Sequence, residues 1–259
     1  MFKSNLFSII YINMKIAILV PTTTNNTKFK NLNDTHLFKY LIPSLMNTLP
    51  EDLQYSIYYA IDDNDKIYNK IQNKKKLLNP QYYKEFTNKP FKITMKPFIY
   101  STKYIHKGNV VAMWNMLFEK AYNDGCDYFF QTGDDIVFYQ KDWLRPCLKQ
   151  IIDNNNIGTS APNDINNMRI LTQSIVSRKH YDIYGYYFNP KITNHFCDDW
   201  INEVYSQQFL KRNNTTLCNK GGKPRYTPTN FQNTRLLCND LVKEDRKKLV
   251  KYLNMKCIS

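Results

Sequence analysis

Two adjacent carboxylates between two apolar runs constrain the fold of this chain more than any other feature. Residues 128–130 are apolar, Gly133 breaks the run, and Asp134 and Asp135 stand directly before a second run at 136–138. Short apolar runs bounded by turn residues predict buried strands. Carboxylates between core segments are costly to bury unless a cation binds them. A hard divalent metal would meet this need, because Mg²⁺ and Mn²⁺ prefer carboxylate oxygen. The alternative is a tight turn in which Asp and Gly only satisfy backbone groups.

The first two predicted strands, residues 16–20 and 55–61, both end in residues that suit a nucleotide. Continuous apolar runs of this kind are typical of strands in a buried parallel sheet. In an open α/β sheet the carboxyl ends of the strands form the edge at which ligands bind. The alternative at each position is an ordinary exit into a solvated loop. The residues at these two strand ends are Pro21, Thr22, Thr23, Asp62 and Asp63.

A phosphate site is predicted at the start of an amphipathic helix that begins at Val110. Apolar residues recur at helical spacing through residue 121, which predicts one buried face. Gly108 and Asn109 precede it and suit a helix N-terminus, where free backbone N–H groups attract phosphate. Lys107 adds positive charge beside them.

A second acidic pair, Asp198 and Asp199, stands before Trp200 at the start of another predicted helix. Acids in a first helical turn often serve only as caps or complement the helix dipole. The functional interpretation is a general base. Residues 178–187, rich in Tyr and basic side chains, are expected to cover the pocket.

The chain is expected to form one main α/β domain at 14–210, preceded by an extension at 1–13. Residues 91–99, interrupted by Pro97, predict a third strand. From Lys211 the sequence turns polar, so residues 211–259 are expected to form a loop and a final helix on the same domain. The helix is predicted at 243–253, and residues 213–235 are the candidate lid.

The formal charge of +14 raises the possibility of a nucleic-acid-binding protein. Only seven of the 36 basic residues are Arg, however, and Arg is the preferred reader of bases and phosphates. A solvated basic surface is therefore favoured, and no nucleic-acid partner is expected. Six scattered cysteines without a C-x-x-C pair favour reduced thiols in a cytosolic protein. The apolar residues 6–12 are too few to span a bilayer.

Four motifs together resemble the GT-A glycosyltransferases, particularly the family-2-like group, over about residues 14–205. The resemblance also extends to uncharacterised GT-A-like proteins of protists and large DNA viruses. It implies a Rossmann-like α/β fold with a mixed, mostly parallel sheet flanked by helices. A viral origin would place the protein in the host cytoplasm, with a membrane-peripheral N-terminus left open. The motifs are Val20-Pro21-Thr22, Ile61-Asp62-Asp63-Asn64, Thr132-Gly133-Asp134-Asp135 and Asp198-Asp199-Trp200.

The resemblance implies a nucleotide-sugar donor, most likely a UDP-sugar, bound through Mn²⁺ or Mg²⁺. Asp135 would ligate the metal, and Asp134 would touch the ribose or a metal-bound water. Asp63 would accept a hydrogen bond from the base. Asp199, or Asp198, would take the proton from an acceptor hydroxyl on a glycan or protein-linked glycan, which gives inversion of configuration.

Two departures and two alternatives accompany this resemblance. Residues 112–115 carry no Arg where many relatives have one, so Lys107 or another base must meet the diphosphate. The chain has no clear C-terminal Q-x-x-R-W motif, which argues against a processive synthase.

Gly133-Asp134-Asp135 also resembles the metal motif of RNA polymerases, so a nucleotidyltransferase is one alternative. A non-enzymatic, basic nucleic-acid-binding protein is the other.

Overall fold

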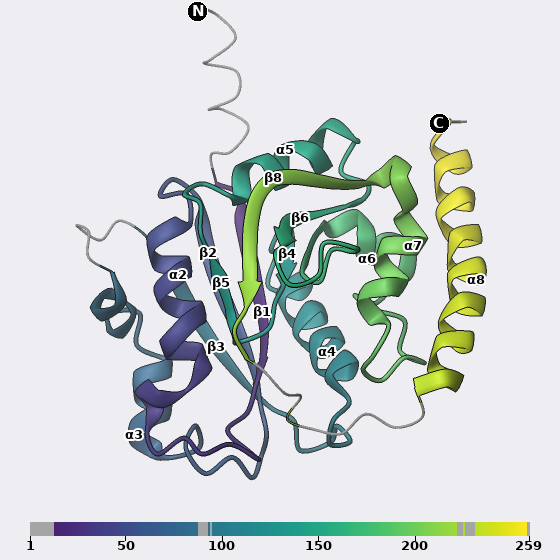
Figure 1. Ribbon diagram of the computed structural model, residues 1–259. Coiled ribbons are helices and arrows are strands. Elements are labelled where there is room, and N and C mark those ends of the chain that lie inside the picture. The colour runs from purple at the N-terminus through teal and green to yellow at the C-terminus, as the bar shows by residue number, and fades with distance from the viewer. Residues whose placement is uncertain (1–12, 88–92, 94, 222–224, 226–230, 258–259) are drawn as a thin grey trace, which may run out of the picture.

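The computed structural model describes residues 13–87, 93, 95–221, 225 and 231–257. Its centre is an eight-stranded mixed sheet with the order β3-β2-β1-β4-β7-β6-β8-β5 and helices on both faces (Figure 1). The strands are β1 (Lys15–Thr22), β2 (Gln54–Ile61), β3 (Met95–Ser101), β4 (Tyr128–Gln131), β5 (Ile136–Phe138), β6 (Thr159–Asp164), β7 (Ser174–Ser177) and β8 (Leu210–Asn219). The helices are α2 (Ile42–Thr48), α3 (Ile71–Leu77), α4 (Val110–Asn123), α5 (Leu144–Asp153), α6 (Arg178–Tyr184), α7 (Cys197–Phe209) and α8 (Phe231–Cys257), with short helical turns η1 (Leu32–Asp34), η2 (Leu37–Leu41) and η3 (Tyr82–Phe86).

Four parallel strands bring the predicted ligand-binding ends to one edge of the sheet. Strand β1 lies between β2 and β4, and β3 extends the parallel set beyond β2. Thr22 at the end of β1 is in register with Ile61 at the end of β2. Strand β7 runs antiparallel to β4 and begins at the same edge, where Ser174 pairs with Gln131. The predicted α/β fold with strand ends gathered at one edge is confirmed.

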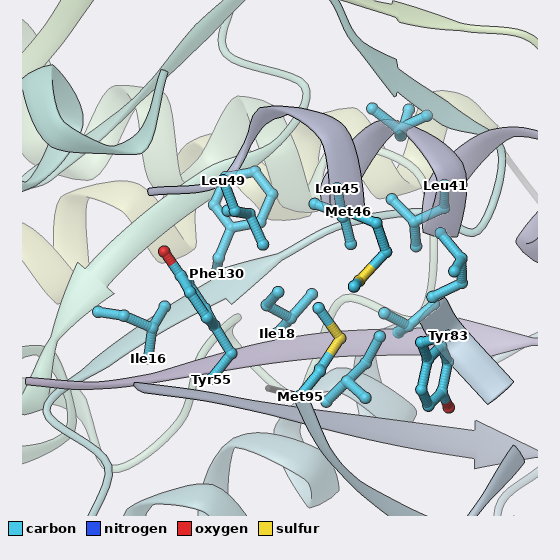
Figure 2. Packing of buried hydrophobic residues seen from close by; sticks show 14 of the residues in the cluster. Ile16, Ile18, Leu41, Leu45, Met46, Leu49, Tyr55, Tyr83, Met95 and Phe130 are labelled. Carbon is cyan, nitrogen blue, oxygen red and sulfur yellow. The ribbon is translucent and has the colours of Figure 1, made fainter. Parts of the chain in front are cut away.

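The hydrophobic core has two layers because successive side chains of a strand point to opposite faces of the sheet. Ile16 and Ile18 of β1 belong to the core layer that contains η2 and α2. Ala17 and Leu19 belong to the layer on the opposite face, which contains α4 and α7. Figure 2 shows side chains of η2, α2 and Leu49 directed toward the strands beside Ile18. Each face of β1 is therefore covered by helices, which explains its continuous apolar run.

The structure corrects the prediction of a loop after Lys211. These residues form β8, which lies between β6 and β5 inside the sheet. Its polar groups find partners there: Asn163 donates to the Asn213 carbonyl, and Gln140 accepts from the Thr216 backbone N–H. Pairing with neighbouring strands overrides the polar sequence, which carries no strand pattern of its own.

Other element limits also shift. Strand β3 begins at Met95 rather than residue 91; residues 88–92 and 94 lie outside the described part of the chain. Helix α8 begins at Phe231, well before the predicted start at Lys243. The extension at 1–13 falls almost wholly outside the described residues, as does much of the candidate lid.

Two further expectations concern thiols and membranes. The five cysteines whose side chains are described are all buried and free, in agreement with the predicted core thiols. Within the described ranges, no helix has the length and apolar character needed to cross a bilayer.

Helix α8 is fixed alongside α7 by one buried carboxylate (Figure 1). Asp245 is 1% exposed and accepts hydrogen bonds from Tyr186 (2.8 Å), Asn189 (2.7 Å) and the indole N–H of Trp200 (3.1 Å). Lys248 pairs with it at 2.7 Å. Because Trp200 directly follows Asp199, the C-terminal helix braces the segment that carries the second acidic pair.

We expect Asp245→Ala to lower the free energy of unfolding by about 2–4 kcal/mol, because it leaves the buried donors of Asn189 and Trp200 without a partner. Urea denaturation followed by circular dichroism would measure the loss. Asp240→Ala is the matched control, since Asp240 is exposed and pairs with the exposed Lys243 on the same helix; it should change stability by less than about 0.5 kcal/mol. Equal effects of the two variants would contradict the bracing role.

Candidate active site

A cavity of about 370 Å³ opens at the carboxyl edge of the parallel strands. Residues from β1, β2, the β4–β5 connection, the start of α4 and the start of α7 all contribute to its wall. Trp114 and Phe188 supply an aromatic part, with ring centroids 5.5 Å apart. The sequence-predicted site residues that line it are Pro21, Thr22, Thr23, Asp62, Asp134, Asp135 and Asp198. The cavity lining does not include four other predicted residues: Asp63, Lys107, Asn109 and Asp199.

Asp134 is held by hydrogen bonds from two distant parts of the chain. The Thr22 hydroxyl donates to one carboxylate oxygen at 2.5 Å. Arg225 donates from both terminal nitrogens, at 2.8 and 2.6 Å, one to each oxygen. Asp134 is only 3% exposed, so this fork-shaped ion pair neutralises a buried charge. Arg225 was not predicted as a site residue.

The Asp135 carboxylate packs so closely against Gly133 and Gly221 that a larger residue at either position would collide with it. A Cβ at Gly221 would lie 1.7 Å from one carboxylate oxygen, and a Cβ at Gly133 would lie 2.7 Å from the other. The Lys220 backbone N–H also donates to the Asp135 carbonyl at 2.8 Å. Strand β8 therefore forms one wall against which the Asp135 side chain is fixed.

Burial and, after it, the neighbouring charge of Asp134 together raise the pKa of Asp135 to about 6, while Arg225 opposes the shift. Both effects disfavour a negative charge at this position. A bound cation would reverse them. The β4–β5 loop is held in place from β7, because Gln173 accepts a hydrogen bond from the Gly133 backbone N–H at 2.9 Å.

His36 completes a group that fits a divalent metal. Ligand atoms of His36, Asp134 and Asp135 all lie within 4.8 Å of one another. Burial lowers the pKa of His36, although Asp134 opposes this, so the imidazole is neutral near pH 7 and its lone pair is available. Two carboxylates and one imidazole are a donor set that suits Mn²⁺ and is acceptable to Mg²⁺. No sequence pattern indicated His36, because this residue precedes a helical turn and lies far along the chain from Asp134 and Asp135.

At the end of β2 the structure separates the two predicted nucleotide-binding acids. Asp62 is buried and accepts hydrogen bonds from the Thr23 hydroxyl (2.7 Å), the Asn25 amide (3.1 Å) and the Thr102 hydroxyl (3.1 Å). Asp63 is exposed and lies outside the lining. Asp62 therefore shapes the cavity wall, and the Thr23 side chain is oriented by it.

Just before α4, Gly108 lines the cavity, whereas the two predicted phosphate-binding residues beside it, Lys107 and Asn109, do not. Gly108 lines the cavity and has a φ of 82°, a conformation that favours glycine. The Asn109 side chain accepts from the Ala112 backbone N–H at 3.0 Å, so it caps the helix. Lys107 does not reach the lining.

The side chains of Asp198 and Asp199 also lie in different surroundings. Asp198 lines the cavity, whereas Asp199 points to an ion pair with Arg169 at 2.7 Å. Burial and, after it, the charge of Asp199 together raise the pKa of Asp198 to about 6. A half-buried carboxylate with a pKa near neutrality, facing the cavity, is suited to accept a proton. Of the two carboxylates, Asp198 is the one in the cavity lining.

The segment expected to cover the pocket does not line it. Residues 178–184 form α6, and His180 is 1% exposed, bonded to the Tyr205 hydroxyl at 2.7 Å and to the Tyr187 carbonyl at 2.9 Å. This histidine is a satisfied core residue. The lining on this side comes instead from Phe188 and residues 194–198.

No protein-family model matches the chain, and no curated protein sequence does. Solved structures do match its fold. S. aureus TarS 1-349 in complex with UDP-GlcNAc superposes with a TM-score of 0.57 at 11% identity, over 90% of this chain and 66% of that one. GalNAc-T7 with UDP, GalNAc and Mn²⁺ gives 0.53 at 9% identity, over 80% of this chain and 44% of that one. The chain thus spans less than two thirds of these proteins. They are GT-A glycosyltransferases, and the predicted GT-A fold is confirmed.

Proposed function

We propose that this protein is a metal-dependent glycosyltransferase that moves a sugar from a UDP-sugar to an acceptor hydroxyl. The observation that carries the proposal is the grouping of Asp134, Asp135 and His36, whose two carboxylates line a cavity at the carboxyl edge of a GT-A sheet. Structures with this fold have been solved with UDP-GlcNAc and with UDP and Mn²⁺. The acceptor proposed is a glycan or protein-linked glycan.

Asp135, Asp134 and His36 would hold the metal, Mn²⁺ or Mg²⁺. When bound, such an ion neutralises the charge that grows on a departing diphosphate. The nucleoside would lie over the ends of β1 and β2, where Pro21, Thr22, Thr23 and Asp62 form the wall. Asp63, in the exposed loop after β2, is proposed to accept a hydrogen bond from the base in the bound state.

Asp198 is proposed as the general base. The acceptor oxygen attacks the anomeric carbon, its proton passes to an Asp198 carboxylate oxygen, and the bond between the anomeric carbon and the diphosphate oxygen breaks. The nucleoside diphosphate leaves with that electron pair. Attack from the side opposite the leaving group inverts the configuration. The role of Asp199 is then to hold Arg169 and to raise the pKa of Asp198 through its charge.

The proposal is tested by incubating the purified protein with UDP-glucose, UDP-GlcNAc and UDP-galactose, each with Mn²⁺ and a mixture of short glycans. Release of UDP and extension of a glycan by one sugar are the expected results with at least one donor. Chelation by EDTA should stop both. Extension that continues unchanged in EDTA would contradict the metal-dependent proposal, as would incorporation of a nucleotide in place of a sugar.

The rate of transfer should fall as pH drops below about 6, because the raised pKa of Asp198 leaves this carboxyl protonated there and unable to accept a proton. The measurement is kcat/KM between pH 5 and 8 at saturating Mn²⁺, where metal binding keeps Asp135 ionised. A rate that is flat down to pH 5, or that rises toward acid, would contradict the assignment of Asp198.

A further inference from the structure

The cavity wall carries far more negative than positive charge for a site that must take a diphosphate. Four carboxylates line it: Asp62, Asp134, Asp135 and Asp198. Among the described residues of the lining, Arg225 is the one Lys or Arg. Oxygen atoms of a diphosphate are recognised best by a guanidinium, which offers paired donors in a fixed plane. His195 also lines the cavity, but within the described lining only Arg225 offers a diphosphate a permanently charged side chain with paired donors.

Arg225 already occupies the atoms that a metal would use. Its two terminal nitrogens contact both oxygens of Asp134, and one of them also lies 3.1 Å from Nδ1 of His36. Only 18% of its side chain is exposed. The backbone carbonyl of Arg225 accepts a hydrogen bond from the Asn26 amide at 2.8 Å, which anchors the residue at the end of β1. Two of the three residues of the candidate metal group are thus engaged by a guanidinium.

A guanidinium and a divalent ion cannot share these atoms. Both are cations that would use the Asp134 oxygens, and the guanidinium also lies against Nδ1 of His36, so binding of one opposes binding of the other. The anchored backbone keeps a displaced Arg225 side chain within the cavity, where the incoming diphosphate offers it a doubly charged partner in place of Asp134. The Arg side chain is long and has several rotatable bonds, so it can change partners without movement of the sheet.

We propose that Arg225 is a counterion that exchanges partners: it pairs with Asp134 while the site is without donor, and it pairs with the donor's diphosphate once metal has taken its place. This inference rests on the proposed function and adds to it the residue that meets the diphosphate. It also makes metal and donor bind in an ordered, coupled way, because the metal releases the cation that the donor needs.

The exchange has a consequence that a purely structural arginine would not have. Without Arg225, a metal no longer competes with a cation for Asp134, so metal should bind more tightly. The diphosphate loses its paired donors, so the nucleotide should bind more weakly. A residue that only stabilises the cavity would weaken both when it is removed.

The experiment measures two dissociation constants on the full chain. The first is that of Mn²⁺ in the absence of nucleotide, from the electron paramagnetic resonance signal of free Mn²⁺. The second is that of UDP at saturating Mn²⁺, from isothermal titration calorimetry. For Arg225→Gln we expect Mn²⁺ to bind about tenfold more tightly and UDP about tenfold more weakly, as hydrogen bonds to charged groups of this kind imply. Arg225→Lys, which keeps the charge but not the fork, should lie between wild type and Arg225→Gln in both.

Arg145→Gln is the matched control, because Arg145 pairs with Asp52 and does not line the cavity; both constants should stay within twofold of wild type. The exchange would be overturned if the dissociation constants of Mn²⁺ and UDP moved in the same direction in Arg225→Gln and Arg225→Lys. It would also be overturned if neither constant changed. Failure of wild-type protein to bind UDP would instead count against the proposed function. The Mn²⁺ measurement, which uses no nucleotide, would still decide whether Arg225 competes with metal.

Discussion

Asp135→Asn is expected to lower kcat/KM for sugar transfer by about 10²–10⁴-fold, because the side chain loses the charge that holds the metal. Stabilisation by a bound metal is worth several kcal/mol, and each 1.36 kcal/mol corresponds to a tenfold change in rate. Asparagine has nearly the same shape, so the glycine walls formed by Gly133 and Gly221 should still accept it. The measurement is initial rate against Mn²⁺ concentration for wild type and variant.

Two companion variants sharpen this prediction. Gly221→Ala places a methyl group where the Asp135 carboxylate lies, so it should reduce activity although Asp135 is intact. Asp153→Asn alters an exposed acid that pairs with Lys149 outside the cavity lining, and it should leave the rate within about threefold of wild type. Full activity of Asp135→Asn at ordinary Mn²⁺ concentration would remove Asp135 from the metal site.

Asp198→Asn is expected to lower kcat by about 10²–10⁴-fold, the usual range for loss of a general base. The KM for the donor should change little, since the base acts on the acceptor. Asp199→Asn is the matched variant: it removes the partner of Arg169 and a charge beside Asp198, so its effect on kcat should be less than about tenfold. Steady-state kinetics with saturating acceptor would compare the two. A larger loss in Asp199→Asn than in Asp198→Asn would reverse the assignment.

The sequence was sufficient for the parts of the site that lie in one segment. The loop at Asp134 and Asp135 was predicted because apolar runs flank it on both sides, and these runs became β4 and β5. Thr22 and Asp62 were predicted because parallel strand ends meet at one edge. Hydrophobic periodicity and strand order are enough to predict the acidic loop and the strand ends, since these features do not depend on contacts between distant segments.

The residues that complete the site could not be predicted in this way. His36, Gln173 and Arg225 reach the acidic loop only through the packing of η2, β7 and the segment after β8. Strand β8 itself has a polar sequence that predicts a loop, and it becomes a strand only because β5 and β6 offer unpaired backbone groups on either side. No local pattern carries this information.

Choosing between Asp198 and Asp199 also required the structure. Consecutive residues on a helix point about 100° apart, so only one of the two can face the cavity, and the sequence does not say which. Phe196, with a φ of 70°, sets the start of α7, and the resulting direction turns Asp198 to the cavity and Asp199 to Arg169. The family-2-like affiliation, a viral origin and the domain limits stay predictions.

The central claim is tested most directly by thermal unfolding with UDP, GDP, CDP and ADP, each with and without Mn²⁺, on wild type and Asp135→Asn. A ligand at a hundredfold over its dissociation constant adds about 2.7 kcal/mol of stability. We predict an upward shift with UDP plus Mn²⁺ that is lost in Asp135→Asn. Absence of a shift with every nucleotide, together with salt-sensitive binding of nucleic acid that needs no metal, would contradict the glycosyltransferase account and favour a basic binding protein.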